Sequence, residues 1–352
     1  MLSQWRARLR RNAKPFRPLT PERASDLCVV VVAILFLVGG LFLERLEARA
    51  AVELPGEALS QVSLQATGAP AGPTGPTTPG TAAELPRAAI APTGPYAPPS
   101  RVRDTDPGPI SSGLAVVIDG DSGLVLWGRD EHGSVPPASL TKIVTALVVL
   151  ERAKPTDLVR VQVDSRRMTD STVMGIWPGE ELTVGDLLYG MMLPSGNDAA
   201  LALAIHLAGS KEAFGELMTA KAHALGLTES RFANPHGLDE AEHYSSAYDM
   251  AMLARHAMQY PLFRDLAAAR FYETERGKGY ELGNLNRFLW RYVGADGVKI
   301  GYTPDAGRTI VASAVKDGHR LIAAVMRGGD IYGDAELLLD WGFATFQWQP
   351  AS

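Results

Sequence analysis

The stretch Pro136-Pro137-Ala138-Ser139-Leu140-Thr141-Lys142 runs directly into the apolar segment Ile143–Leu150. Proline is tolerated in the first turn of a helix, but a helix does not continue into the residues before it. This pattern therefore predicts a buried helix that begins near Ser139. Residues three apart are neighbours on a helix surface. The sequence therefore places the Ser139 hydroxyl beside the Lys142 amine.

A serine hydroxyl beside a lysine amine is a possible nucleophile and base. The lysine acts as a base only if its surroundings lower its pKa, which an apolar helix and nearby positive groups favour. The free N–H groups of a helix start also suit an oxyanion. The same spacing arises by chance, however: Ser313 and Lys316 repeat it in an alternating run, where the period of a strand separates the side chains.

The charge of the chain is unevenly distributed. The 352 residues carry a net charge of −5, yet seven basic residues precede Leu27 against two acidic ones, so the remainder is acidic. This argues against a nucleic-acid partner. We interpret residues 1–26 as a basic cytoplasmic segment, followed by an apolar run, Leu27–Leu43, that serves as a transmembrane anchor or uncleaved signal.

The positive-inside rule then directs the rest of the chain out of the cytoplasm, as a single-pass membrane protein with an extracytoplasmic domain. A secreted form cleaved near Ala50 is the alternative, but the charged residues before Ala50 disfavour it. The only cysteine, Cys28, excludes an intrachain disulfide, and the histidines lack a metal-binding spacing. We expect no metal and no cofactor.

Residues 44–111 are rich in Pro, Ala, Gly and Thr and predict a semi-extended tether. The folded domain is expected over residues 112–348. A hairpin is predicted at Leu114–Ile118 and Leu124–Trp127, around a glycine turn. Helices are then predicted at Ser139–Leu150, Val184–Met192, Asp198–Leu207, Lys211–Leu225, from Ser246 to before Pro261, and Asp334–Phe346, with strands at Gly297–Gly301, Thr309–Val315 and Arg320–Met326.

This order of elements predicts an α/β fold. Two strands open the domain, three close it and a helical block lies between them, so one five-stranded sheet built from both chain ends buries the apolar faces most simply. Helices would flank the sheet, with an inserted all-helical lobe. The crevice between sheet and lobe is the expected pocket.

Two further polar segments lie where this pocket would form. Pro194-Ser195-Gly196-Asn197-Asp198 falls between two predicted helices, where a helix cap is the simpler interpretation. Lys299-Ile300-Gly301 lies on a predicted strand, where a solvated edge lysine is the simpler one. Neither segment is informative alone.

Taken in order, the three segments resemble the Ser-x-x-Lys, Ser-x-Asn and Lys-Thr-Gly motifs of penicillin-recognising enzymes. The chain is most similar to the D-alanyl-D-alanine carboxypeptidase group of low-molecular-mass penicillin-binding proteins, from about Ser112 to Phe346. Further stretches typical of that group are Asn234-Pro235-His236-Gly237-Leu238, His243-Tyr244-Ser245-Ser246-Ala247-Tyr248-Asp249 and Leu339-Asp340-Trp341-Gly342-Phe343.

The resemblance implies a β-lactamase/DD-peptidase-like fold with an antiparallel sheet, and a serine-type carboxypeptidase that cleaves D-Ala-D-Ala in peptidoglycan stem peptides. Ser139 would form the acyl-enzyme, Lys142 would take its proton, and β-lactams would act as covalent inhibitors. The other implied catalytic residues are Ser195, Asn197 and Lys299. The implied substrate-binding residues are Ile300, Gly301, Tyr302 and Thr303, with the backbone N–H groups of Ser139 and Tyr302 as the oxyanion hole.

The chain departs from the family pattern at two positions. Ile300 replaces the usual threonine, and Ile331 occupies the position that we align with a common arginine, so both usual contacts to the substrate carboxylate are missing. Thr303, Arg308 or Arg327 are possible substitutes. The departures raise the hypothesis of a D,D-endopeptidase.

Two other functions remain open at this stage. A catalytically weak, peptidoglycan-binding relative is compatible with Ile300. A β-lactamase is less compatible, because no convincing Glu-x-x-x-Asn segment lies between Asn197 and Lys299.

Overall fold

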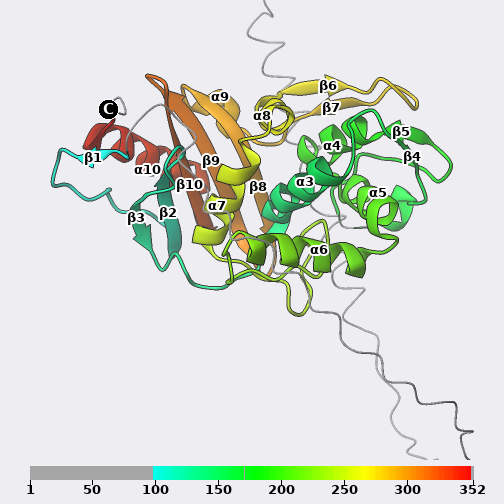
Figure 1. The fold of residues 1–352 in the computed structure, drawn as a ribbon, viewed down its shortest axis with the longest axis horizontal. Coiled ribbons are helices and arrows are strands. Elements are labelled where there is room, and N and C mark those ends of the chain that lie inside the picture. The colour runs from blue at the N-terminus through cyan, green and yellow to red at the C-terminus, as the bar shows by residue number, and fades with distance from the viewer. Residues whose placement is uncertain (1–97, 170, 350–352) are drawn as a thin grey trace, which may run out of the picture. The chain divides into compact units, whose positions relative to one another are not determined.

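A five-stranded antiparallel sheet lies at the centre of the structure, a computed structural model that describes residues 98–169 and 171–349. The strands lie in the order β3-β2-β10-β9-β8 (Figure 1). They are β2 (Leu114–Asp119), β3 (Val125–Arg129), β8 (Ala295–Thr303), β9 (Gly307–Lys316) and β10 (His319–Gly328). The prediction of one sheet built from both chain ends is confirmed, because β2 pairs with β10.

Both faces of the sheet are buried. In β10, Ile322 and Ala324 pack towards one apolar cluster and Leu321 and Ala323 towards another, as the two-residue period of a strand requires. A strand covered on both faces needs apolar residues at successive positions, which explains the unbroken apolar run in β10.

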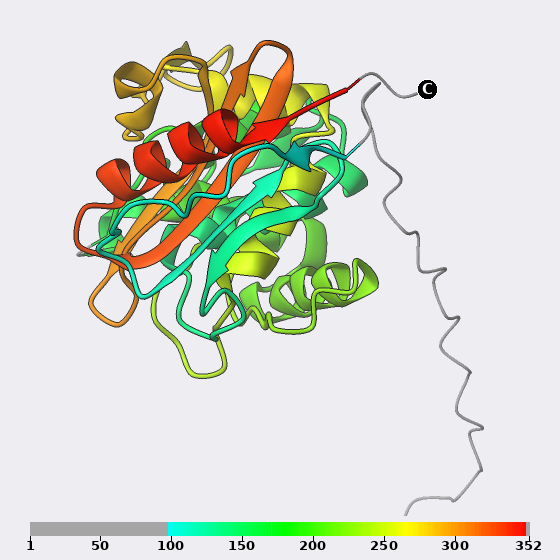
Figure 2. The same ribbon diagram turned by 90° about the vertical axis from the view of Figure 1, so that its left-hand side faces the viewer.

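Helices cover the two faces unequally. The C-terminal helix α10 (Ile331–Thr345) runs across one face, and α7 (Ala247–Ala257) lies behind the sheet in the same view (Figure 2). The face behind the sheet also carries the helical lobe. Its helices are α3 (Thr141–Arg152), α4 (Val184–Met192), α5 (Asn197–Ala208), α6 (Lys211–Ala224) and α8 (Pro261–Ala268).

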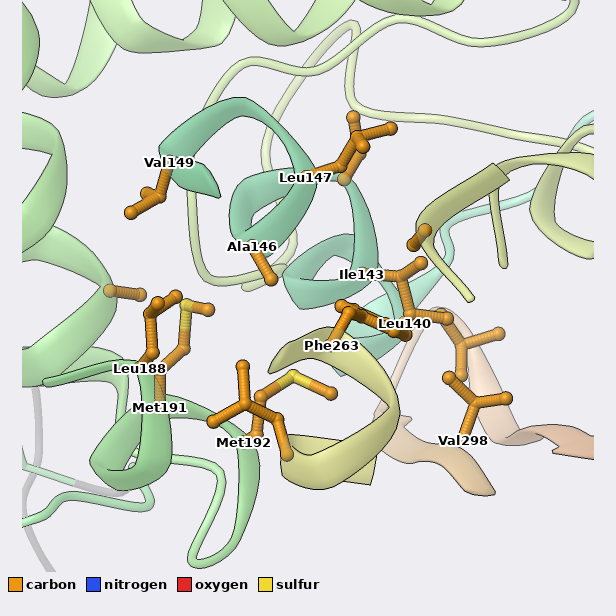
Figure 3. Close-up of a cluster of buried hydrophobic side chains, with 14 of the residues drawn as sticks. Leu140, Ile143, Ala146, Leu147, Val149, Leu188, Met191, Met192, Phe263 and Val298 are labelled. Carbon is orange, nitrogen blue, oxygen red and sulfur yellow. The ribbon is translucent and has the colours of Figure 1, made fainter. Parts of the chain in front are cut away.

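Helix α3 is surrounded by apolar side chains. Leu140, just before it, and Ile143 lie near Phe263 of α8 and Val298 of β8, while residues of α4 pack further along the helix (Figure 3). The residues from Thr141 to Val149 are all buried. Any polar group on this helix is therefore held away from water.

Three predicted helix starts are confirmed by their caps. The Thr183 hydroxyl accepts a hydrogen bond from the Asp186 N–H, and the Asp186 carboxylate accepts one from the Thr183 N–H, which makes the complete capping box of α4. Ser210 caps α6 and Ser246 caps α7. These side chains satisfy backbone N–H groups that have no partner within the helix.

The structure also contains short elements that the sequence analysis did not predict. They have two to eight residues, which is too short for a reliable hydrophobic period. They are the strand pairs β1 (Ser100–Arg101) with β11 (Phe346–Gln347), β4 (Leu158–Arg160) with β5 (Glu181–Thr183), and β6 (Phe271–Glu273) with β7 (Glu281–Gly283), the 3₁₀ turns Ala138–Leu140 and Ser165–Arg167, and the helices α8 and α9 (Phe288–Arg291).

The N-terminal predictions fall mostly outside the described residues. This applies to the segments 1–26 and 27–43 and to the tether up to residue 97. Among the residues that the structure describes, no helix has the length and hydropathy of a membrane span.

The folded part begins earlier than the predicted residue 112. Strand β1 pairs with β11, and the Asp334 carboxylate accepts hydrogen bonds from the Ser111 N–H (2.8 Å), the Ser111 hydroxyl (2.8 Å) and the Ser112 N–H (3.0 Å). The last residues assigned to the tether are thus part of the domain. The sequence did not predict this early start of the domain, because the segment contains Pro and Gly and because backbone pairing at a domain edge needs no apolar pattern.

We expect Asp334→Ala to lower the free energy of unfolding by about 3 kcal/mol, because it leaves two backbone N–H groups without a charged acceptor. Asp330→Ala is the control: it removes an exposed cap of the same helix, to the Gly333 N–H, and should cost about 1 kcal/mol. Urea unfolding of both variants measures the difference. Equal losses would contradict the anchoring role of Asp334.

Candidate active site

Ser139 and Lys142 are neighbours at the start of α3, as predicted. Ser139 lies in the 3₁₀ turn Ala138–Leu140, and the Lys142 Nζ is 3.0 Å from its Oγ. Ala138 has a left-handed φ of 51°, which is uncommon for a residue with a Cβ. Such conformations persist where the surrounding packing enforces them, and here one sits directly before the serine.

The Lys142 amine has three oxygen neighbours within hydrogen-bond distance. Besides Ser139 Oγ, the Nζ lies 2.6 Å from Asn197 Oδ1 and 2.6 Å from the His236 carbonyl oxygen. Both of these oxygens only accept hydrogen bonds. In the neutral form of the amine, which has two N–H donors and one lone pair, the two carbonyls accept its hydrogens and the lone pair is left for the Ser139 hydroxyl.

The surroundings of Lys142 favour this neutral state. Burial lowers the pKa of Lys142 well below its ordinary value, and the positive charge of Lys299 lowers it again, while Asp198 acts in the opposite direction. The side chain is fully buried. An amine with a lowered pKa can act as a base near neutral pH.

The His236 carbonyl is a part of the site that the sequence analysis did not identify. Asn234 Oδ1 accepts a hydrogen bond from the Gly237 N–H (2.7 Å) and so holds the turn that presents this carbonyl. Gly237 has a φ of 91°, and a Cβ there would collide with the backbone of Ala138. The stretch Asn234–Leu238 was recognisable as typical of the family, but the role of a backbone carbonyl is not visible in side-chain chemistry.

Ser195 lies in the turn between α4 and α5, and Asn197 is the first residue of α5. Ser195 has a left-handed φ of 61°, and its buried hydroxyl has no hydrogen-bond partner among the described residues. Asn197 contacts Lys142 through Oδ1 and donates from Nδ2 to the Ser171 hydroxyl at 2.6 Å. An unpaired buried hydroxyl in a site is a candidate for transferring a proton.

Ser171 and Thr172 were not predicted as site residues. The Thr172 hydroxyl donates to the Ser195 carbonyl (2.7 Å), and the Thr172 carbonyl accepts the Asn197 N–H (2.9 Å). The buried Asp198 carboxylate extends this connection by accepting three backbone N–H groups of residues 174–176. This polar loop carries no recognisable sequence motif. Its role is therefore visible only in its tertiary contacts.

Strand β8 brings the third segment against the serine. A Cβ on Gly301 would lie 2.8 Å from the Ser139 backbone nitrogen, so only glycine allows this approach. Lys299 is buried, which lowers its pKa to about 7, and its Nζ donates to the Ile300 carbonyl at 3.0 Å. Positive charge and strand backbone therefore adjoin the nucleophile.

One cavity of about 790 Å³ joins these segments. The predicted site residues that line it are Ser139, Ser195, Asn197, Lys299, Ile300, Gly301, Tyr302 and Thr303. Lys142 does not line it, because it is buried next to Ser139. Within the described part of the chain, no group of His, Cys, Asp and Glu residues could hold a metal ion.

The two departures from the family pattern also face this cavity. Ile300 and Ile331 both line it, together with Arg308, whereas Arg327 does not. Thr303 is committed elsewhere, since its hydroxyl donates to Asp239 Oδ1 at 2.6 Å.

Comparison with known proteins identifies the family of the chain. The family model for D-alanyl-D-alanine carboxypeptidase matches residues 101–329. A D-alanyl-D-alanine carboxypeptidase of Bacillus subtilis is 37% identical over 246 residues, which cover 67% of this chain and 63% of that protein. The chain thus spans less than two thirds of the length of this relative.

Two solved structures share the fold. The D-alanyl-D-alanine carboxypeptidase of Mycobacterium tuberculosis H37Rv has a TM-score of 0.65 and 35% identity, covering 70% of this chain and 96% of that one. The Streptomyces K15 DD-transpeptidase has a TM-score of 0.65 and 28% identity, covering 68% and 100%. These matches confirm the predicted β-lactamase/DD-peptidase-like fold, and the chain belongs to the D-alanyl-D-alanine carboxypeptidase family.

Proposed function

We propose that this protein is a serine-type D,D-carboxypeptidase that removes the terminal D-alanine from peptidoglycan stem peptides through an acyl-enzyme. The observation that carries the proposal is the buried Lys142 amine, 3.0 Å from Ser139 Oγ and 2.6 Å from both the Asn197 side-chain oxygen and the His236 carbonyl oxygen. This arrangement supports a base aimed at one hydroxyl.

Acylation begins when Lys142 takes the Ser139 proton and the Oγ attacks the carbonyl carbon of the D-Ala-D-Ala bond. The carbonyl oxygen becomes an oxyanion, which the backbone N–H groups of Ser139 and Tyr302 stabilise. When the intermediate collapses, the C–N bond breaks and the leaving nitrogen needs a proton. The unpaired Ser195 hydroxyl passes it from the Lys142 ammonium.

Deacylation repeats these steps with water. A water molecule gives a proton to Lys142 and attacks the ester carbon, and the Ser139 oxygen recovers a proton as the acid product leaves. The net reaction consumes one water and releases one D-alanine. Lys299 contributes positive charge beside the anionic substrate. β-Lactams follow the first half of this path, because their strained amide acylates Ser139.

A second candidate function is a D,D-endopeptidase. Its support is that Ile300 and Ile331, which line the cavity, supply no donors for the carboxylate of a C-terminal residue. A substrate cleaved at an internal cross-link has no carboxylate at that place.

We also propose that the protein acts outside the cytoplasmic membrane as a single-pass membrane protein. Support comes from the apolar run Leu27–Leu43 and the seven basic residues before it. Peptidoglycan lies on that side of the membrane. Protease treatment of intact and permeabilised spheroplasts distinguishes the two topologies, since an extracytoplasmic domain is digested without permeabilisation.

Ser139→Ala should abolish the covalent adduct with penicillin, because it removes the attacking oxygen. Mass spectrometry after incubation with the antibiotic measures the adduct. Ser313→Ala is the control: Ser313 and Lys316 have the same spacing but lie in β9, and this variant should retain the adduct. A rapidly disappearing wild-type adduct would indicate a β-lactamase, and no wild-type adduct would indicate a binding protein.

The second-order rate constant for acylation by an anionic penicillin should show a bell-shaped dependence on pH. It rises from acid pH as Lys142, whose pKa is lowered, loses its proton and becomes a base. It falls above pH 7, because Lys299 has a pKa of about 7 and loses its positive charge there. Stopped-flow fluorescence measures both limbs.

The variant Lys299→Arg keeps its charge at alkaline pH and should lose the falling limb. A falling limb that persists in this variant, with an unchanged unfolding temperature, would contradict the assignment to Lys299.

A further inference from the structure

The end of the cavity beside Ile300 requires a different anion-binding group from the usual one. Ile300 and Ile331 both line the cavity, and their side chains offer only apolar surface. A substrate carboxylate placed against them would lose water without gaining a hydrogen bond, which is costly. If the substrate ends in a carboxylate, another residue must bind it.

Arg308 lies on the strand next to the one that carries Ile300. It is on β9, directly opposite Tyr302 of β8, and the adjacent same-face pair is Ile300 with Ile310. Residues of neighbouring strands that are diagonal to each other on one face lie within reach of long side chains. The Arg308 guanidinium can therefore extend over Ile300, and its side chain does line the cavity.

The Arg308 guanidinium is available for a ligand. Its one hydrogen bond among the described residues is a long one, 3.4 Å, to the Gly329 carbonyl. No carboxylate of the described residues forms an ion pair with it; Asp330, which also lines the cavity, accepts a hydrogen bond from the Gly333 N–H. Most of its five donors are unoccupied.

The other candidates are less suitable. Arg287 also lines the cavity, but it precedes α9 and does not lie on the strand pair that carries Ile300. The Thr303 hydroxyl already donates to Asp239. Arg327 does not line the cavity, and it donates to the Asp305 carbonyl, also at 3.4 Å. Lys299 lies on the opposite face of β8 from Ile300, because successive side chains of a strand alternate.

We infer that Arg308 binds the C-terminal carboxylate of the substrate and so replaces the hydroxyl and the arginine that Ile300 and Ile331 remove. This inference rests on the proposed function and names the specificity determinant of the same site. The planar guanidinium can hold a carboxylate through two parallel hydrogen bonds. The cavity then favours a free C-terminal residue over an internal cross-link, which argues for the carboxypeptidase and against the endopeptidase.

The test is a thermodynamic cycle that varies both the Arg308 side chain and the C-terminal carboxylate of the substrate. Wild type and Arg308→Gln are assayed on a diacetyl-lysyl-D-Ala-D-Ala peptide and on the same peptide with a C-terminal amide, which has no negative charge. We expect Arg308→Gln to raise KM for the free acid by 10- to 100-fold, which is about the effect of losing a charged hydrogen-bonded pair. The KM for the amide should change less than 3-fold.

Arg327→Gln is the matched control. Arg327 is an exposed arginine on the next strand, β10, with a similar hydrogen bond but outside the cavity. Its replacement should leave KM for both substrates unchanged. Arg308→Lys should recover part of the loss through its charge, and Ile300→Thr added to Arg308→Gln should recover part of it through the restored hydroxyl. The unfolding temperature of each variant shows that the fold is intact.

Equal effects of Arg308→Gln on the acid and the amide, or none on either, would overturn the inference while wild-type cleavage still supports the proposed function. If wild type cleaves neither peptide and forms no adduct with penicillin, the proposed function fails and the inference fails with it. The two failures are therefore distinguishable by the wild-type measurements alone.

Discussion

The burial of one amine without a charged partner constrains the rest of the domain. A buried lysine is stable only when it is paired or neutral, and Lys142 contacts two carbonyls and a hydroxyl within hydrogen-bond distance. The apolar packing around α3 supports this arrangement, since it excludes water and offsets the cost of burying the amine. The environment that lowers the pKa of Lys142 beside Ser139 is thus a consequence of how the core is packed.

Backbone shape brings the three segments together. Gly301 lets β8 approach the backbone of Ser139, and Gly237 lets the turn that carries the His236 carbonyl approach Ala138. Ala138 and Ser195 adopt left-handed conformations beside the cavity. These close approaches leave little freedom to the side chains, which is the pre-organisation that a stable oxyanion and a directed proton transfer both need.

The sequence predicted the parts of this structure that depend on local rules. The capped start of α4 at Thr183 and the apolar strands were predictable because their patterns are local. The loop at Ser171 and the anchoring of Ser111 by Asp334 were not, since these contacts join residues far apart in the chain. The orientation of Arg308 likewise required the register of β9 against β8.

The pairing of β2 with β10 sets an order of events during synthesis. Leu114 pairs with Met326, so about 200 residues must be translated before the middle of the sheet can close. Contacts between such distant positions make folding slow and late. Because Lys299 also belongs to the last third of the chain, an emerging polypeptide already carries Ser139 and Lys142 but has no complete cavity. The cavity is therefore complete only after the strand that carries Lys299 has been made.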